Sequence, residues 1–263
     1  MMKNQRKNIL GYIFTFLAFL IWGILPIYWK QLKHVSAMEI LVHRIFWTML
    51  ILLVINFFRY RKYLSVAFKT NKKIRYLLIS ALFLGINWFL FIYAISINRI
   101  LDASLGYYIN PLVSVLLGVI FLKEKLPRVQ KVSLFLATIG VLYLTINYGR
   151  LPVISLALAF SFGLYGLVRK KINIKPIPAV LIESAILLPV FSIYYIMTIP
   201  SVSDIAFIYS DGLTVFYLIF AGVVTFVPLV LYGQGVNMIP LKSVGFIQYI
   251  TPTFMLLIGT VMY

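Results

Sequence analysis

The sequence contains no cysteine and only six acidic residues among its 263 positions. Without cysteine, the chain can form no disulfide, no thiolate zinc site and no thiol nucleophile. Its two histidines, His34 and His43, belong to no HExxH motif, and the chain has no GxGD motif and no pair of acids at catalytic spacing. The sequence therefore lacks the motifs required for metalloprotease, aspartyl protease or Ser–His chemistry. We expect no enzyme activity, no metal and no cofactor.

Apolar residues, by contrast, make up 62% of the chain and charged residues only 11%. The mean hydropathy is +1.00, and it arises from long apolar runs that are spread over the whole length. So much apolar surface exceeds what one water-soluble core could bury. We therefore expect the lipid bilayer to surround most of the chain, with no region left over for a catalytic domain outside the membrane.

Nine segments are long and apolar enough to span a bilayer as helices. They cover residues 9–29, 37–58, 76–97, 101–122, 129–148, 152–168, 178–199, 213–236 and 241–263. The basic stretch Met1–Asn8 resembles the front of a signal peptide, but the run that follows is long enough to span, and no small-residue cleavage site comes after it. The sequence predicts an all-α, polytopic membrane helix bundle whose first helix is retained.

The formal net charge of +18 has two possible explanations, nucleic-acid binding and membrane topology. The basic residues lie in short connections between apolar segments, which favours topology and leaves no nucleic-acid partner. Nineteen of the 24 Lys and Arg fall on the side of the amino terminus, four on the other side (Lys30, Lys33, Arg99 and Arg150), and Arg44 lies within a helix. This bias predicts a cytoplasmic amino terminus in a bacterial inner membrane.

The two halves of the chain resemble each other. A shift of 141 residues superposes Tyr108, Ile109, Pro111 and Gly118 on Tyr249, Ile250, Pro252 and Gly259. Nearly the same shift lays the segment AFLIWG (18–23) over AFSFG (159–163) with one gap. Five helices per repeat is an odd number, so the second repeat would be inserted upside down, as in many transporters. We expect repeats at residues 1–148 and 149–263, with the tenth helix missing from the second.

Six segments resemble the RarD family of EamA-type permeases, in the drug/metabolite transporter superfamily. They are EILVHRIFW (39–47), NW (87–88), ASLGYYINPL (103–112), KEKL (123–126), SFGLYGLVRK (161–170) and QYITPT (248–253). The resemblance covers the whole chain in order, and it implies a ten-helix permease of the bacterial inner membrane. The chain departs from that pattern by ending within helix nine.

Two charges lie inside predicted helices, where a charged side chain costs about 2.5 to 3.5 kcal/mol and is a functional-site hypothesis by default. Arg44 lies closer to the outer end of its helix and Glu183 closer to the inner end of its own, so they fall on opposite sides of the midplane. We therefore interpret them as symmetry counterparts rather than as partners of each other.

Each of these charges then needs its own partner of opposite sign. We hypothesise an outer pair of Arg44 with Asp102 or Glu39, and an inner pair of Glu183 with Lys242. The two pairs would act as gates on either side of one cavity, with the helix-two and helix-seven charges of opposite sign. In the alternative, Asp102 and Lys242 are solvated charges at the interface and Arg44 only snorkels.

Glu39 and His43 are four residues apart and share a helix face, so they could form a protonatable relay. The alternative is that His43 only packs. Glu124, between two lysines at the inner end of its helix, is expected to be an exposed structural charge.

Pro111 and Pro252 are expected to break their helices at equivalent positions. A proline leaves the carbonyl four residues earlier without its donor, here those of Tyr107 and Gln248. Freed carbonyls and nearby polar or aromatic side chains near the midplane are typical of the substrate site of an inverted-repeat carrier. The remaining candidates for that site are Asn87, Trp88, Tyr108, Asn110 and Tyr249. In the alternative, the prolines only kink the helices and the tyrosines pack.

The sequence thus predicts a secondary transporter of a small metabolite or drug-like solute that works by alternating access. A channel-like or regulatory membrane protein is the alternative, although no repeated filter or ring of charges supports a pore. Proton coupling through Glu39, His43 or Glu183, exchange and uniport are all compatible with the sequence, as is any oligomeric state. The mixture of aromatic, amide and charged groups suits a small zwitterion or an amphipathic metabolite.

Overall fold

The structure is a computed structural model that describes residues 2–60, 62–63, 65, 70–149, 151–172, 174–199 and 201–262. Within these ranges the chain consists of helices joined by short connections and contains no strand. The long helices are α1 (Met2–Lys30), α2 (Ala37–Ile55), α4 (Asn71–Ser96), α5 (Ile100–Leu122), α6 (Arg128–Asn147), α7 (Val153–Ile172), α8 (Pro176–Thr198) and α10 (Gly212–Met238). The chain ends with α11 (Leu241–Gln248) and α12 (Ile250–Met262). The short elements are a π-helical turn η1 (Asn56–Tyr60), a 3₁₀ turn η2 (Val202–Asp204) and α9 (Ala206–Tyr209).

The described residues contain nine helical segments long and apolar enough to cross a membrane, which confirms the nine predicted spans. Several boundaries differ from the prediction. The first helix already begins at Met2, and α2 continues as a π-helical turn to Tyr60. The last span is divided in two at Tyr249, because Pro252 cannot donate to the carbonyl of Gln248. The predicted break at Pro111 is wrong, since α5 runs through that proline as one helix.

Helix starts follow local capping chemistry. The Ser36 hydroxyl accepts from the backbone N–H of Glu39 (3.1 Å) at the start of α2, and Asp211 does the same for Thr214 (3.1 Å) at the start of α10. Hydrogen bonds from the hydroxyl and the backbone N–H of Thr214 hold the pKa of Asp211 below its ordinary value. Helix α8 begins with Pro176, whose missing N–H would have had no partner there.

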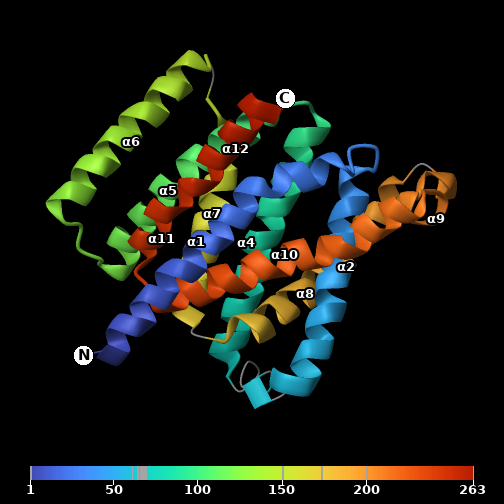
Figure 1. Ribbon diagram of the computed structural model, residues 1–263, viewed down its shortest axis with the longest axis horizontal. Helices are drawn as coiled ribbons and strands as arrows, with labels where there is room; N and C mark the ends of the chain where they lie inside the picture. The colour runs from blue at the N-terminus through green and yellow to red at the C-terminus, as the bar shows by residue number, and fades with distance from the viewer. Residues whose placement is uncertain are drawn as a thin grey trace.

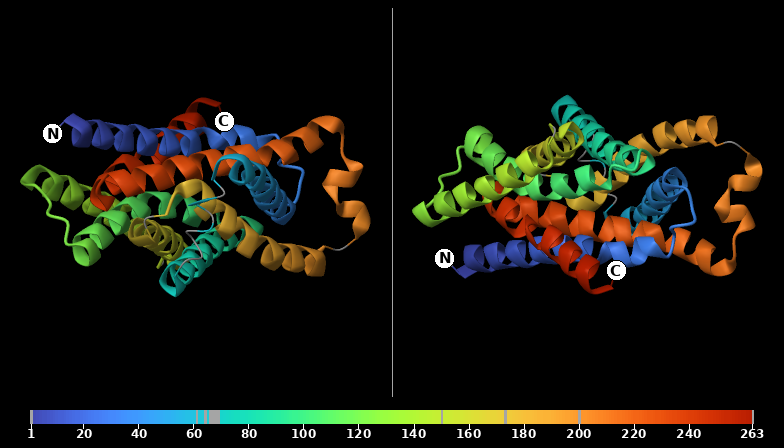
Figure 2. Two further views of the ribbon diagram at one scale, coloured as in Figure 1. Left: turned by 90° about the horizontal axis from the view of Figure 1, so that it is seen from below. Right: turned by 90° about the horizontal axis from the view of Figure 1, so that it is seen from above.

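The long helices form one bundle (Figures 1 and 2). Helix α1 lies along α10, α2 packs against both α8 and α10, and α7 packs against both α4 and α5. Helix α6 stands aside in Figure 1, and none of its residues is buried. The amino terminus and α9 lie at opposite extremes of the molecule. Because apolar contact with lipid offers no driving force for helix association, close packing between helices must hold this bundle together.

Glycines permit the closest of these helix crossings. A Cβ atom at Gly222 of α10 would lie 2.5 Å from the Cβ atom of Trp47 and 2.7 Å from its carbonyl carbon on α2. A Cβ atom at Gly245 of α11 would lie 2.8 Å from the carbonyl oxygen of Pro111 on α5. At both crossings the backbones are in near contact, which only a residue without a side chain allows.

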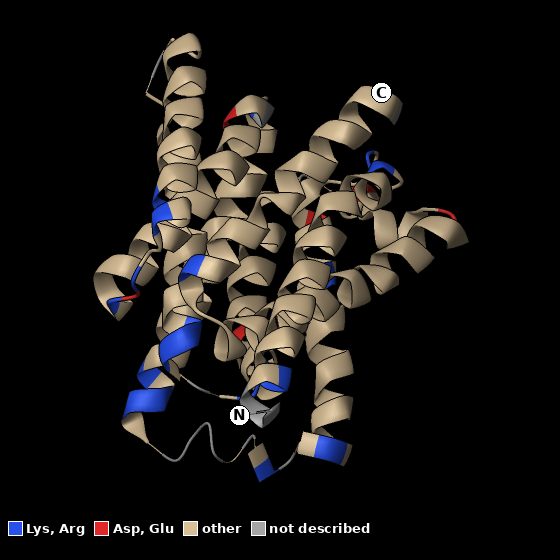
Figure 3. Cartoon of the chain, turned by 60° about the vertical axis from the view of Figure 1, so that its left-hand side comes forward, with Lys and Arg blue, Asp and Glu red and all other residues tan. Residues whose placement is uncertain are grey.

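Lys and Arg gather at the end of the bundle where the amino terminus lies, which we call the basic end (Figure 3). The opposite end, where α1 ends and α2 begins, carries few basic residues. The topology prediction also counts Arg61, Lys69 and Arg150, which lie outside the described residues. The asymmetry among the described residues has the sense that the positive-inside rule requires for a cytoplasmic amino terminus.

Substitution of Gly222 by alanine is expected to destabilise the protein by about 1 to 3 kcal/mol, because the new methyl group would collide with the α2 backbone. Gly140→Ala in α6 is the matched control, since nothing lies within 4 Å of a Cβ atom there. Unfolding of the purified variants in detergent measures both effects. Equal stabilities would contradict the close crossing of α2 and α10.

The cysteine-free sequence makes topology directly measurable. Lys33→Cys at the far end and Lys72→Cys at the basic end each introduce a single thiol. A membrane-impermeant maleimide added to intact cells is expected to label Lys33→Cys and to label Lys72→Cys only after lysis. The reverse pattern would place the amino terminus outside.

Candidate functional site

A cavity of about 490 Å³ lies within the half of the bundle farther from the basic end. Its wall includes Trp29, Lys30 and Ala37 at the ends of α1 and α2, so it reaches the end of the bundle. A volume of this size is typical of sites for small molecules. The cavity is lined by six residues that the sequence analysis selected: Arg44, Asn87, Trp88, Tyr107, Asn110 and Gln248.

Arg44 provides the cationic group at the centre of the cavity wall. Its guanidinium carbon lies 4.8 Å from the ring centroid of Trp88 and 5.3 Å from that of Trp29, a cation–π arrangement with both rings. Its Nε donates to the hydroxyl of Thr225 on α10 (3.1 Å). All of these partners are neutral, and no carboxylate among the described residues forms an ion pair with Arg44.

Three amides complete the polar wall. Ser114 donates towards the side-chain oxygens of Gln248 (3.2 Å) and Asn110 (3.5 Å), and thereby links α5 to α11. The NH₂ group of Asn87 donates hydrogen bonds to the carbonyl of Leu158 (2.9 Å) and to the hydroxyl of Ser161 (3.1 Å). The NH₂ groups of Asn110 and Gln248 thus remain as donors on the cavity wall, although both side chains are almost fully buried.

Packed aromatic rings close the cavity towards the basic end. Trp22 and Phe162 form its floor, with ring centroids 5.6 Å apart. Beneath them, Tyr232 lies 5.2 Å from Phe162 and 6.0 Å from Tyr165. Tyr165 and Tyr232 are fully buried. Five rings, including that of Phe19, therefore form a plug contributed by α1, α7 and α10, which we call the aromatic floor.

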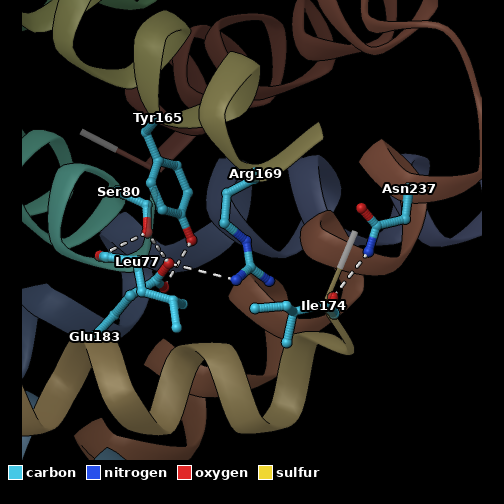
Figure 4. Close-up of polar contacts among 7 residues, drawn as sticks. All are labelled: Leu77, Ser80, Tyr165, Arg169, Ile174, Glu183 and Asn237. Carbon is cyan, nitrogen blue, oxygen red and sulfur yellow. Dashed lines mark hydrogen bonds and ion pairs between the residues drawn. The ribbon is translucent and has the colours of Figure 1, made fainter. Parts of the chain in front are cut away.

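A buried ion pair adjoins the aromatic floor at Tyr165 (Figure 4). Glu183 of α8 lies 3.3 Å from Nη1 of Arg169 on α7, and both side chains are at most 2% exposed. The same carboxylate accepts from the hydroxyls of Ser80 on α4 (2.6 Å) and Tyr165 (3.2 Å). Figure 4 shows these three side chains converging on Glu183 from two helices. We call these four residues the Glu183 cluster.

Arg169 is only partly satisfied within this cluster. Its Nε and Nη2 atoms are buried and have no hydrogen-bond partner among the described residues. A buried ion pair needs well-satisfied hydrogen bonds to offset its desolvation, so this pair is an expensive feature of the packed state. The neighbouring Lys170 instead reaches the carbonyls that end α10, those of Val236 (2.7 Å) and Ile239 (2.6 Å).

Both predicted charge pairs are wrong. Asp102 forms its ion pair with Arg99, three residues earlier (2.9 Å), and also accepts from the hydroxyl of Tyr148. Arg44 lies on α2 and forms no ion pair with Asp102 of α5 among the described residues. The pairing failed because the sequence does not reveal which helices are neighbours, and because Asp102 finds a partner within its own helix turn.

The inner pair fails for a different reason. Glu183 finds its partner in Arg169, which the sequence analysis had counted among the loop charges of the basic end. Lys242 instead donates to the carbonyl of Lys125. Glu124 was predicted to be an exposed structural charge, but it caps α11. Its two carboxylate oxygens accept from the backbone N–H groups of Leu241 and Lys242, at 2.8 Å each.

Glu39 and His43 lie outside the cavity. They do share a face, with His43 Nε2 4.0 Å from a Glu39 oxygen. The buried Glu39 carboxylate, however, accepts from the backbone N–H groups of Ala206 (3.1 Å) and Phe207 (2.9 Å) at the start of α9. The His43 ring stacks on Phe207 at 4.6 Å. This geometry holds the α8–α10 connection against α2, and the proton relay stays a prediction.

The other predicted site residues, Tyr108, Tyr249, Pro111 and Pro252, do not line the cavity. The sequence analysis missed Thr225, Ser80, Tyr165 and Arg169. The repeat could have indicated Arg169. A shift of 140 residues superposes Trp29 on Arg169, and Trp29 is a neighbour of Arg44, the counterpart of Glu183.

Glu183→Ala is expected to destabilise the protein by about 3 to 5 kcal/mol, because it leaves the Arg169 guanidinium buried without a counter-charge. Lys242→Gln, which removes a charge from the pair that the structure does not form, should cost less than about 1 kcal/mol. Denaturant titration in detergent measures both. A small loss of stability in Glu183→Ala would contradict the ion pair with Arg169. A large loss of stability in Lys242→Gln would instead support the predicted pair of Glu183 with Lys242.

The family model of the EamA-like transporter family matches residues 9–146. An uncharacterized transporter of Bacillus subtilis is 40% identical over 96% of this chain and 85% of its own length. Protein RarD of Escherichia coli is 42% identical over 96% of this chain and 86% of its own length. A solved crystal structure that is 15% identical covers 95% of this chain and 88% of its own, with a TM-score of 0.72, and supports the fold alone.

These similarities confirm the resemblance drawn from the six sequence segments. The nine apolar helical segments of the described residues make the protein a multi-pass membrane protein, and the matching relatives carry the name of transporter or of RarD. The chain belongs to the EamA-like transporter family, is of the RarD type within it, and is a membrane transporter.

Proposed function

We propose that the protein is a secondary transporter of a small metabolite or drug-like solute in the bacterial inner membrane, working by alternating access. The observation that carries the proposal is the one-sided cavity. It reaches the end of the bundle opposite the amino terminus, and the aromatic floor and the Glu183 cluster close it towards the basic end. With the amino terminus in the cytoplasm, this state faces outward.

Arg44 and Glu183 occupy corresponding helix positions and contact corresponding helices, which supports exchange between two states. Arg44 is the eighth residue of α2 and Glu183 the eighth of α8. Arg44 bonds a hydroxyl on α10 and stacks on Trp29 of α1. Glu183 bonds a hydroxyl on α4 and pairs with Arg169 of α7.

Helix packing follows the same correspondence, with α1, α2, α4 and α5 matching α7, α8, α10 and α11–α12. Helix α1 lies along α10 just as α7 lies along α4, and α5 packs on α7 just as α1 packs on α12. These equivalent contacts support inverted repeats at residues 1–148 and 149–263. In the opposite state the Glu183 cluster would face the open cavity, and Arg44 would be enclosed.

The channel alternative is disfavoured by the aromatic floor, since a conducting path would have to cross five packed rings and a buried ion pair. A gate of this kind is suited to a carrier, in which one end closes while the other is open.

Counterflow in proteoliposomes tests the proposal. Vesicles containing the protein are loaded with each unlabelled amino acid or small amphipathic drug in turn, and uptake of the labelled solute is followed. A carrier is expected to give saturable uptake with a transient overshoot, because the internal solute returns the site to the outside. Uptake with no overshoot for any solute would support a channel, and no uptake at all would support a regulatory protein.

Glu183→Gln keeps the shape of the side chain but removes the counter-charge of Arg169, so we expect counterflow to fall at least tenfold. Lys33→Gln, an exposed charge outside the cavity, is the control and should leave the rate unchanged. Repeating the assay with an imposed pH gradient distinguishes proton coupling from exchange and uniport. A Glu183→Gln rate equal to wild type would remove the ion pair from the transport cycle.

A further inference from the structure

We propose that the cavity binds an organic anion, a carboxylate carried on a planar apolar body, and that Arg44 is its counter-charge. The inference rests on the proposed transport function and names the class of solute that would be carried. It replaces the mixed-charge site expected from the sequence, because Glu183 pairs with Arg169 below the aromatic floor, and Asp102 and Glu39 are held by other partners.

The first step of the argument concerns charge. A guanidinium in the interior of a membrane protein normally pairs with a carboxylate or marks a ligand pathway. Arg44 meets one hydroxyl and two indole rings, which stabilise a cation but do not neutralise it. The described residues that line the cavity include Arg44 and no acidic side chain. The cavity therefore has an unbalanced positive charge.

The second step concerns hydrogen-bond polarity. Asn110 and Gln248 are 6% and 4% exposed, and the single hydroxyl hydrogen of Ser114 is shared between their amide oxygens, 3.5 Å and 3.2 Å away. Their NH₂ groups border the cavity and have no acceptor among the described residues. Neither amide nitrogen is enclosed by the protein, so both are available to donate to acceptor atoms on a ligand. A carboxylate supplies such acceptors and matches the planar fork of Arg44 in a bidentate manner.

The third step concerns the rest of the wall, which is apolar and rich in aromatic rings. Trp29 and Trp88 hold the guanidinium, while Trp22, Phe91 and Phe162 line the space around it. Such rings favour flat apolar groups through stacking. A strongly hydrated inorganic anion would leave this surface uncovered. The geometry therefore selects an amphipathic carboxylate over a small ion, a sugar or a cation.

Tryptophan emission offers a direct readout, because three of the four tryptophans, Trp22, Trp29 and Trp88, border the cavity. Purified protein in detergent is titrated with phenylacetate, with its uncharged counterpart phenylacetamide and with the cation phenethylammonium. We expect saturable binding of phenylacetate at millimolar concentration or below, at least tenfold tighter than that of the amide, and none of the amine. Chloride and acetate, titrated in parallel, should bind more weakly than phenylacetate.

Arg44→Gln should abolish the preference for the carboxylate, while Lys33→Gln, at the same end but outside the cavity, should retain it. Arg44→Lys guards against misfolding of the Gln variant, since it keeps the charge and should keep a weaker preference for the anion. Equal affinity for phenylacetate and phenylacetamide, preference for the amine, or no saturable carboxylate binding overturns the proposal. Survival of the preference in Arg44→Gln overturns the role of Arg44.

The two proposals fail separately. Carboxylate binding without counterflow of the same carboxylate would refute the carrier and leave the anion site in place. Saturable counterflow of neutral or cationic solutes, with no preference for carboxylates in the binding titration, would support the carrier and refute the anion site.

Discussion

The cost of placing a charge inside a membrane protein governs the rest of this structure. Two side chains, Arg44 and Glu183, bear that cost in equivalent helices, and the fold treats them in opposite ways. Glu183 receives an ion pair and two hydroxyl hydrogen bonds, and the rings above it exclude the cavity. Arg44 receives only neutral partners and faces open space. Glu183 is enclosed by the protein, whereas Arg44 borders the cavity. This difference defines which end of the bundle is open.

The same contrast explains how a small structural change could open the closed end and close the open one. The Glu183 cluster holds α4, α7 and α8 together at the closed end, but two nitrogen atoms of Arg169 have no partner among the described residues. A packed arrangement with unsatisfied buried donors is less stable than its burial alone would suggest. The unsatisfied donors lower the stability of the closed end, while Gly222 and Gly245 allow close packing at the crossings α2–α10 and α5–α11.

An anion at Arg44 would complete this arrangement. A bound carboxylate would give Arg44 the counter-charge that Arg169 provides to Glu183, so each end of the cavity would hold one neutralised pair. Neutralisation removes the main electrostatic obstacle to enclosing Arg44 in the opposite state. Substrate chemistry and gating would then depend on the same physical requirement, that no charge is enclosed without a partner.

The sequence by itself determined the helix content, the nine spans, the asymmetry of basic residues and the family, because each depends on composition or on local order along the chain. It also selected Arg44, Asn87, Trp88, Tyr107, Asn110 and Gln248, all of which line the cavity. Only the tertiary structure decided which charges meet. Asp102 pairs within its own helix turn, and Glu183 pairs with a residue of a supposed loop cluster. Both outcomes depend on which helices are neighbours, and a hydropathy pattern carries no information about helix neighbours in lipid, where every apolar face is equally well solvated.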